Sequence, residues 1–97
     1  MGSLREFQEL MRSLYYERDS RRGPYKTMLW LVSEVGELAD ALTRSNKRGI
    51  EREAADVLAW LCSECNLLGI DLEDVAFKKY GRGCPKCGGS PCRCSEG

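Results

Sequence analysis

Apolar residues recur at intervals of three or four through most of this chain, which is the spacing of one face of an α-helix. Strand-like alternation of apolar and polar residues is missing from the sequence. We therefore expect an all-α fold, a four-helix bundle. The positions that define the four apolar stripes are Phe7, Leu10, Met11 and Leu14, then Met28, Leu31, Val35, Leu38 and Leu42, then Ala54, Val57, Leu61, Cys65 and Leu68, and finally Leu72, Val75 and Ala76, with Lys79 on the same inner side.

Local signals predict the ends of the first two helices. Ser3 followed three residues later by Glu6 is a capping-box pattern, so the first helix should begin there. Residues 17–23 are charged and lack apolar periodicity, which predicts a loop. Pro24 suits the first turn of a second helix, which should run to about Arg44.

Similar signals bound the last two helices. Residues 45–49 predict a turn, and the third helix should start near Ile50. Gly69 is a typical C-terminal stop, and Asp71 is a good N-cap. The fourth helix is expected over residues 72–80, because Gly81-Arg82-Gly83 should end it.

The composition changes after the fourth helix, where cysteine, glycine and proline dominate. We expect residues 1–81 to form a helical domain and residues 82–97 a cysteine-rich tail. The tail has the spacing C-x₂-C-x₄-C-x-C, and four thiolates this close can complete a tetrahedral site for a structural Zn²⁺. Its ligands would be Cys84, Cys87, Cys92 and Cys94. A redox-active pair, a set of disulfides and a disordered tail are the alternatives. Cys62 and Cys65 lie on an apolar helix and are expected to be core residues.

Several function classes are disfavoured by what the sequence contains. The chain has 97 residues and no histidine, so a Ser-His-Asp or Cys-His catalytic unit cannot be built from it. Its 15 basic and 15 acidic residues argue against a broadly basic surface for nucleic acid or anionic membranes. No apolar run reaches the ~18 residues of a membrane helix, and the first residues do not resemble a signal peptide. The expected compartment is the cytoplasm.

Two pairs of carboxylates are candidates for a metal site. Glu34 and Glu37 share one side of the second helix, and Glu53 and Asp56 share one side of the third. At about 100° per residue, Glu34 and Glu53 fall beside the apolar seams rather than in the middle of the solvated face. Converging carboxylates require a cation, and oxygen-only ligands suit Mg²⁺ or Mn²⁺. The alternative is a set of ordinary surface acids.

These motifs resemble the MazG-like nucleotide pyrophosphohydrolases. The stretch Trp30-Leu-Val-Ser-Glu34-Val-Gly-Glu37 followed by Glu53-Ala-Ala-Asp56 is similar to that family's E-x-x-E and E-x-x-D pattern, and the similarity extends over roughly residues 4–80. The resemblance implies a helical fold that assembles as a homodimer or homotetramer. It also implies hydrolysis of a nucleoside triphosphate, NTP or dNTP, to the monophosphate and pyrophosphate. The implied metal ligands are Glu34, Glu37, Glu53 and Asp56.

Other assignments stay open from the sequence. Lys78 and Lys79 are candidates for contacting the substrate phosphates, as are Lys26 and the Arg21-Arg22 pair, although solvated charges explain them equally well. Ser33 stands where many members of the family carry another glutamate, so the number of ions and the general base are not defined. Aromatic residues could stack on the base or belong to the core, and Glu64 could be an accessory ligand or an intersubunit ion-pair partner. These aromatic residues are Trp30, Trp60 and Tyr80. Neither the base nor the sugar of the substrate can be predicted.

A second class of function competes with the enzyme. The chain could be a non-catalytic helical adaptor whose zinc tail binds protein or nucleic acid. An adaptor has no need for paired inward-facing carboxylates at two places, whereas an enzyme has no clear need for the tail. We therefore expect the enzyme, with nucleotide substrate as its partner and with no membrane or nucleic-acid partner.

Overall fold

The computed structural model describes residues 2–95, and all regular structure in that range is helical, as predicted. The four helices are α1 (Leu4–Arg22), α2 (Pro24–Thr43), α3 (Lys47–Leu68) and α4 (Leu72–Tyr80). Within this range no helix is long and apolar enough to span a membrane. Residues 96 and 97 of the predicted tail, and residue 1, lie outside the described residues.

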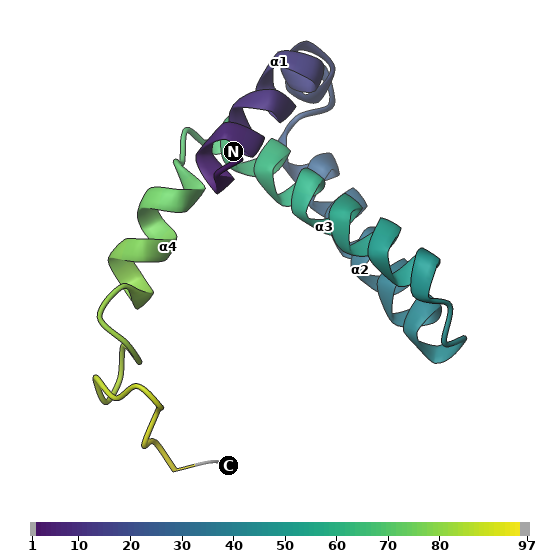
Figure 1. The fold of residues 1–97 in the computed structure, drawn as a ribbon. Helices are drawn as coiled ribbons and strands as arrows, with labels where there is room; N and C mark the ends of the chain where they lie inside the picture. The colour runs from purple at the N-terminus through teal and green to yellow at the C-terminus, as the bar shows by residue number, and fades with distance from the viewer. Residues whose placement is uncertain (1, 96–97) are drawn as a thin grey trace.

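The helices are arranged around one antiparallel pair. A tight turn joins α2 to α3, and the two helices run side by side (Figure 1). The first helix, α1, packs mainly against α3 and also contacts α2. The fourth helix, α4, contacts α1 and then projects away from the α2–α3 pair, with the tail continuing from its end (Figure 1).

Most of the predicted helix ends are confirmed by the backbone. The Ser3 side chain accepts a hydrogen bond from the Glu6 amide, and the Glu6 side chain accepts one from the Ser3 amide, which completes the capping box. Pro24 lies in the first turn of α2. Gly69 ends α3 in the left-handed region at φ 68°, and the Asp71 side chain caps α4.

Two predicted boundaries are wrong. Residues 17–23 do not form a loop, because α1 continues through Arg22 and stops at Gly23. Asp19 in this segment is only 2% exposed and forms a 2.9 Å ion pair with Arg22, so tertiary burial and an i,i+3 pair stabilise a helical turn that shows no apolar period. The third helix begins at Lys47 rather than near Ile50, since the Asn46 side chain accepts a hydrogen bond from the Gly49 amide at 3.1 Å.

A buried amide network fixes the start of α4. The Gln8 Nε2 atom donates to Asn66 Oδ1 at 3.0 Å and to the Ile70 carbonyl at 2.7 Å, while Gln8 Oε1 accepts from the Leu72 amide at 2.9 Å. Asn66 Nδ2 in turn donates to the Gln8 carbonyl at 3.2 Å. One side chain of α1 therefore satisfies polar groups at the end of α3 and the beginning of α4.

The predicted inner face of the fourth helix is only partly covered in the single chain, where Leu72 and Ala76 are half-buried. Val75 is 43% exposed, and Lys79 is exposed with its ammonium 5.5 Å from the centre of the Tyr80 ring. The ion pairs that tie α4 to α1 lie at its first turn, where Arg5 meets Asp71 and Glu73. Because α4 is attached mainly at this end, its second half is largely exposed within one chain.

We predict that Gln8→Ala destabilises the fold by about 2 kcal/mol or more, because the change leaves buried donors and acceptors without partners. Urea unfolding followed by circular dichroism measures this loss. Glu9→Ala, which alters an exposed neighbour on the same helix, serves as the control and should change stability far less. Equal stability of the Gln8→Ala and Glu9→Ala variants would contradict the role assigned to the network.

Candidate active site

The packing of α2 against α3 brings three of the four predicted acids together. Glu34 and Glu37 come from consecutive turns of α2 and Glu53 from the first half of α3, and an oxygen from each lies within 4.8 Å of the others. Glu34 and Glu53 are half-buried, whereas Glu37 is exposed. Among the residues of the described range, no lysine or arginine forms an ion pair with any of these three acids.

This convergence changes the acidity of the cluster. A hydrogen bond with Glu37 contributes most to raising the pKa of Glu34 to about 7, followed by burial and by the charges of Glu37, Asp56 and Glu53. Burial raises the pKa of Glu53, and the charges of Glu37 and Asp56 raise it further, against a smaller opposing effect of Arg52. Without a cation, the cluster therefore keeps a proton that isolated glutamates would lose.

Asp56, the fourth predicted acid, lies at the edge of this cluster. It is exposed and is not one of the three residues whose oxygens are mutually close. Its charge nevertheless raises the pKa of both Glu34 and Glu53, so it is near enough to act on them. Asp56 also lines an adjoining cleft and so connects the two features.

The cleft has a volume of about 250 Å³ and lies between α1 and α3. It combines charged, aromatic, apolar and small side chains, which are Met11, Tyr15, Arg18, Asp19, Arg22, Asp56, Ala59, Trp60 and Ser63. The Arg22 guanidinium lies 4.8 Å over the Trp60 ring, and Trp60 stacks on Trp30 with ring centres 5.9 Å apart. The cleft thus offers an apolar aromatic wall and cationic groups beside the carboxylate cluster.

Sequence reasoning found only part of the contribution of α1 to this cleft, because Arg22 was a candidate for contacting substrate phosphates and does line the cleft. Arg18 and Asp19 were not candidates, because residues 17–23 were predicted to be a loop, and nothing in the sequence singled out Tyr15. The Asp19–Arg22 spacing was the available signal, since it places an acid and a base one helical turn apart. Asp19 Oδ1 accepts from Arg22, while Asp19 Oδ2 is buried with no hydrogen-bond partner among the described residues.

The remaining candidates do not line the cleft. Lys78 and Lys79 are exposed on α4, which projects away from the α2–α3 pair (Figure 1). Glu64 is 4% exposed, its Oε1 atom has no hydrogen-bond partner in the described range, and burial raises its pKa. Cys62 and Cys65 are buried in α3, and burial raises the pKa of Cys62 to about 11, so its thiol stays protonated.

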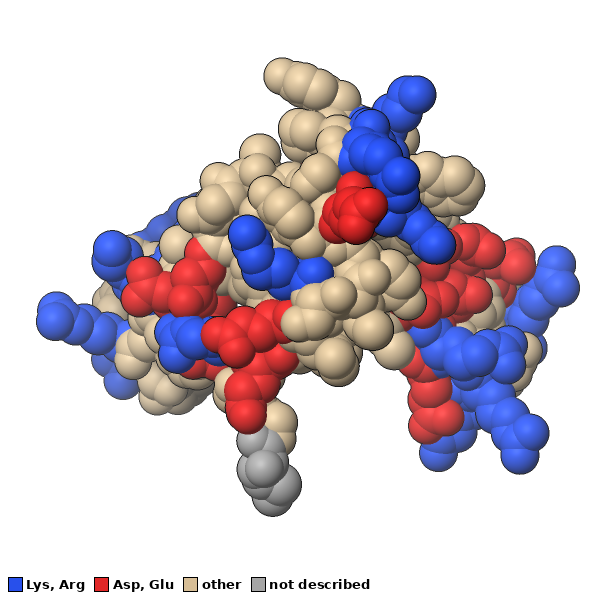
Figure 2. Space-filling model, turned by 90° about the horizontal axis from the view of Figure 1, so that it is seen from above, with Lys and Arg blue, Asp and Glu red and all other residues tan. Residues whose placement is uncertain are grey.

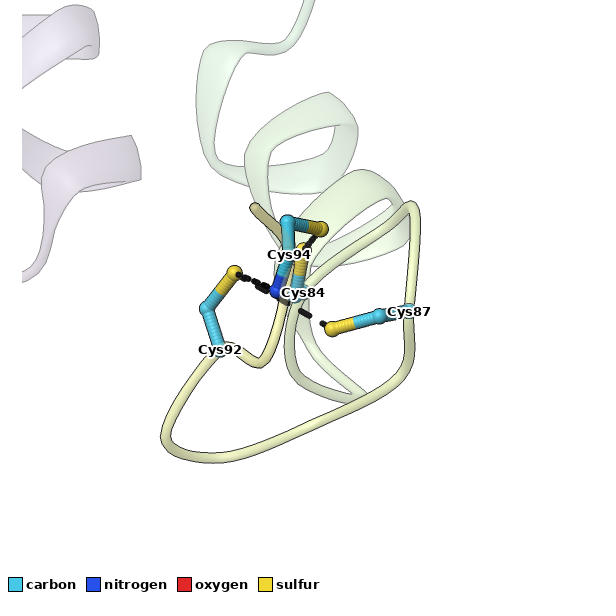
Figure 3. Close-up of side chains that lie close together, drawn as sticks. All are labelled: Cys84, Cys87, Cys92 and Cys94. Carbon is cyan, nitrogen blue, oxygen red and sulfur yellow. Dashed lines mark hydrogen bonds between the residues drawn. The ribbon is translucent and has the colours of Figure 1, made fainter. Parts of the chain in front are cut away.

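The tail forms a second, separate cluster. The sulfur atoms of its four cysteines lie within 4.8 Å of one another, in the loops that follow α4 (Figure 3).

Figure 2 shows acidic and basic side chains interspersed over the face viewed, without a broad area of either sign. Nothing on this face resembles the extended basic surface of a duplex-binding protein.

The helices and acidic pairs described above fall within the part of the chain that matches a known protein family. The family model of the MazG nucleotide pyrophosphohydrolase domain matches residues 22–88. The chain belongs to this family. A comparison with curated proteins gave no match. The MazG match includes α2, α3 and α4 with all four predicted acids, and it ends before Cys92 and Cys94.

The raised pKa of Glu34 predicts the pH dependence of the metal-free protein. Between about pH 4.5 and 7 the native state retains a proton that the unfolded chain has released, so stability should fall as pH rises through this range. Glu34→Gln should raise the melting temperature at pH 7 and flatten the slope. Differential scanning fluorimetry in EDTA measures both effects.

The control for this prediction is Glu51→Gln, which changes an exposed acid of α3 outside the cluster. Glu53 and Glu64 also have raised pKa values, so part of the slope should remain in Glu34→Gln. A slope that is the same in wild type, Glu34→Gln and Glu51→Gln would show that Glu34 does not carry the effect.

Proposed function

We propose that this MazG-family protein is a metal-dependent nucleoside triphosphate pyrophosphohydrolase. It would hydrolyse the bond between the α- and β-phosphates of an NTP or dNTP and release a monophosphate and pyrophosphate. The observation that carries the proposal is the convergence of Glu34, Glu37 and Glu53 within 4.8 Å, without a basic ion-pair partner in the described range, beside an open cleft. When all three carboxylates are ionised they repel one another, and a bound cation would offset that repulsion.

The donors fit Mg²⁺ or Mn²⁺. All are carboxylate oxygens, the ligand type that hard divalent cations prefer, and the site has neither histidine nor thiol. The proton held by Glu34 up to a pKa of about 7 is what a divalent cation would displace. Glu34, Glu37, Glu53 and Asp56 are the proposed ligands. When bound, the ion would neutralise phosphate charge and lower the pKa of a bound water.

Residues of the protein would accept the proton, contact the phosphates and line the cleft. Asp56 borders both the cluster and the cleft, so we assign to the carboxylate oxygen of Asp56 that is not bound to the metal the task of accepting a proton from the attacking water. Arg18 lines the cleft and is suited to contacting phosphate oxygens. Trp60 supplies an apolar wall that excludes water on one side. Lys78 and Lys79 could contact substrate phosphates only in the site of another copy, because their own helix leads away from the cleft.

The compartment we propose is the cytoplasm, where nucleotide substrates and reduced thiols occur together. The division into a helical domain over residues 1–81 and a tail over residues 82–97 is also proposed. It is supported by the last helix ending at Tyr80.

We predict that Glu37→Gln and Asp56→Asn each abolish magnesium-dependent pyrophosphate release while leaving the helical content unchanged. The loss should exceed the roughly 10–100-fold typical when a group that only supports a metal ligand is removed. The assay is a panel of canonical and modified NTPs and dNTPs with Mg²⁺ or Mn²⁺, with both products identified by chromatography.

Glu51→Gln is the matched control, because it neutralises an exposed acid on α3 outside the cluster. It should retain full activity. A folded wild-type protein without turnover across the panel would contradict the proposal and favour the helical adaptor instead. Monophosphate production that persists in both cluster variants would show that the reaction takes place elsewhere.

We also propose that the chain forms a homodimer or homotetramer. Only five apolar residues in the described range are buried, which is a small core for α1, α2 and α3. In contrast, Tyr25, Leu29 and Val32 form one stripe along α2 and are 88%, 69% and 60% exposed. A second copy would cover this stripe and remove its apolar surface from water.

The double variant Leu29→Glu/Val32→Glu should shift the assembly towards the monomer, because a charged residue would be buried in the contact. Sedimentation velocity over a range of concentrations measures the mass. Lys47→Glu, an exposed change at the start of α3, is the control and should leave assembly unaltered. A monomeric wild type would contradict the proposal, and an unaltered mass for the double variant would exclude this stripe as the contact.

A further inference from the structure

The cysteine-rich segment after α4 has a defined fold although it has almost nothing to pack. Residues 82–95 contain no apolar residue other than proline and cysteine, and each residue is exposed or half-buried. Ordering a backbone costs roughly 1–2 kcal/mol per residue, and no hydrophobic core offsets that cost here. A different interaction has to hold these loops together.

The four sulfur atoms have the spacing of a single tetrahedral ion site. Cys84 and Cys94 Sγ are 3.7 Å apart, and Cys87 and Cys92 Sγ are 3.9 Å apart (Figure 3). A tetrahedron with Zn–S bonds of about 2.3 Å has edges of about 3.8 Å. A disulfide would need sulfurs about 2.05 Å apart, and all four cysteines are free thiols.

The surrounding backbone supports charged thiolates. The Cys87 sulfur accepts hydrogen bonds from the amides of Gly89 at 3.4 Å and Arg93 at 3.2 Å, and the Cys92 sulfur accepts one from the Cys94 amide at 3.3 Å. Hydrogen bonds of this kind favour the ionised sulfur that binds metal. The loop is also closed by backbone pairing, with the Gly88 amide donating to the Cys84 carbonyl at 2.7 Å.

Close backbone approach accounts for two of the glycines. A Cβ at Gly89 would lie 2.7 Å from the Pro91 carbonyl oxygen and 3.4 Å from the Cys87 sulfur. Gly83 has φ +106°, and a Cβ there would lie 3.1 Å from the Gly88 carbonyl oxygen. The turns that gather the cysteines therefore have no room for larger residues at these two positions.

We propose that Cys84, Cys87, Cys92 and Cys94 bind one Zn²⁺, and that this ion holds the segment in its fold. Four thiolates favour a thiophilic ion of tetrahedral preference, unlike the oxygen cluster between α2 and α3. Because the protein fills all four positions, the ion has no open site for water or substrate and its role is structural. The site is independent of the reaction proposed for the acidic cluster.

The test uses the full-length protein purified under reducing conditions and dialysed against metal-free buffer. Elemental analysis should find about one zinc per chain. Cys84→Ser and Cys92→Ser should each lose it, whereas Glu37→Gln and Cys62→Ala should retain it. Cobalt substitution should give thiolate-to-metal charge-transfer bands in wild type that are absent in Cys84→Ser.

Three results would overturn the proposal. These are no zinc in the reduced wild-type protein, iron in its place, or zinc that persists in both cysteine variants. Zinc lost from Glu37→Gln but kept in Cys84→Ser would assign the ion to the acidic cluster instead. None of these outcomes depends on hydrolysis, so they are distinguishable from a failure of the proposed function.

A second variant tests the geometry while leaving every ligand in place. Gly89→Ala should weaken zinc binding at least about tenfold in a competition with a chromophoric chelator, because its methyl group collides with the Pro91 carbonyl. Ser90→Ala changes the exposed neighbouring residue and should bind zinc like wild type. Equal affinity of the two variants would contradict this arrangement of the loop.

Discussion

The proximity of three carboxylates at the α2–α3 contact is the constraint on which the candidate site depends. One carboxylate oxygen from each of Glu34, Glu37 and Glu53 lies within 4.8 Å of the others, and when all three groups are ionised this proximity is repulsive. The packing of α2 on α3, with Leu31 and Ala41 buried, has to offset that repulsion. A cation bound at the cluster would offset this repulsion, so the feature that lowers the stability of the metal-free fold is also the one on which the proposed metal site rests.

The first helix, α1, packs beside the α2–α3 pair and forms a cleft with α3. Its C-terminal half brings Arg18, Asp19 and Arg22 beside Asp56 and Trp60, and its N-terminal half carries Gln8 at the junction of α3 and α4. Helix α1 therefore forms one wall of the cleft and also sets the direction in which α4 projects from the end of α3. Loss of helix in residues 17–22 would remove one side of the cleft without touching the acidic cluster.

The parts of this fold that could be predicted from sequence are those decided locally. Ser3 with Glu6, Gly69 and Asp71 satisfy backbone groups a few residues away, and all three positions agree with the structure. The acidic pairs were also visible, because two carboxylates one turn apart share a side of any helix. The helical turn around Asp19 was missed because burial against other helices stabilises it. The direction of α4 was missed because it depends on a buried glutamine, a polar residue that leaves no apolar period.

The two clusters offer ligands of different chemistry, so each would select a different metal ion. Carboxylate oxygens on α2 and α3 select hard cations that retain water, while the tail presents sulfur alone in a closed set of four. The clusters lie on different parts of the fold, because the tail leaves from the end of α4 and α4 projects away from the α2–α3 pair (Figure 1). Zinc in the acidic cluster would lack its preferred sulfur ligands, and magnesium in the tail would lack oxygen. Ligand chemistry and separation along the fold would thus keep the proposed zinc of the tail apart from the proposed metal ion of the acidic cluster.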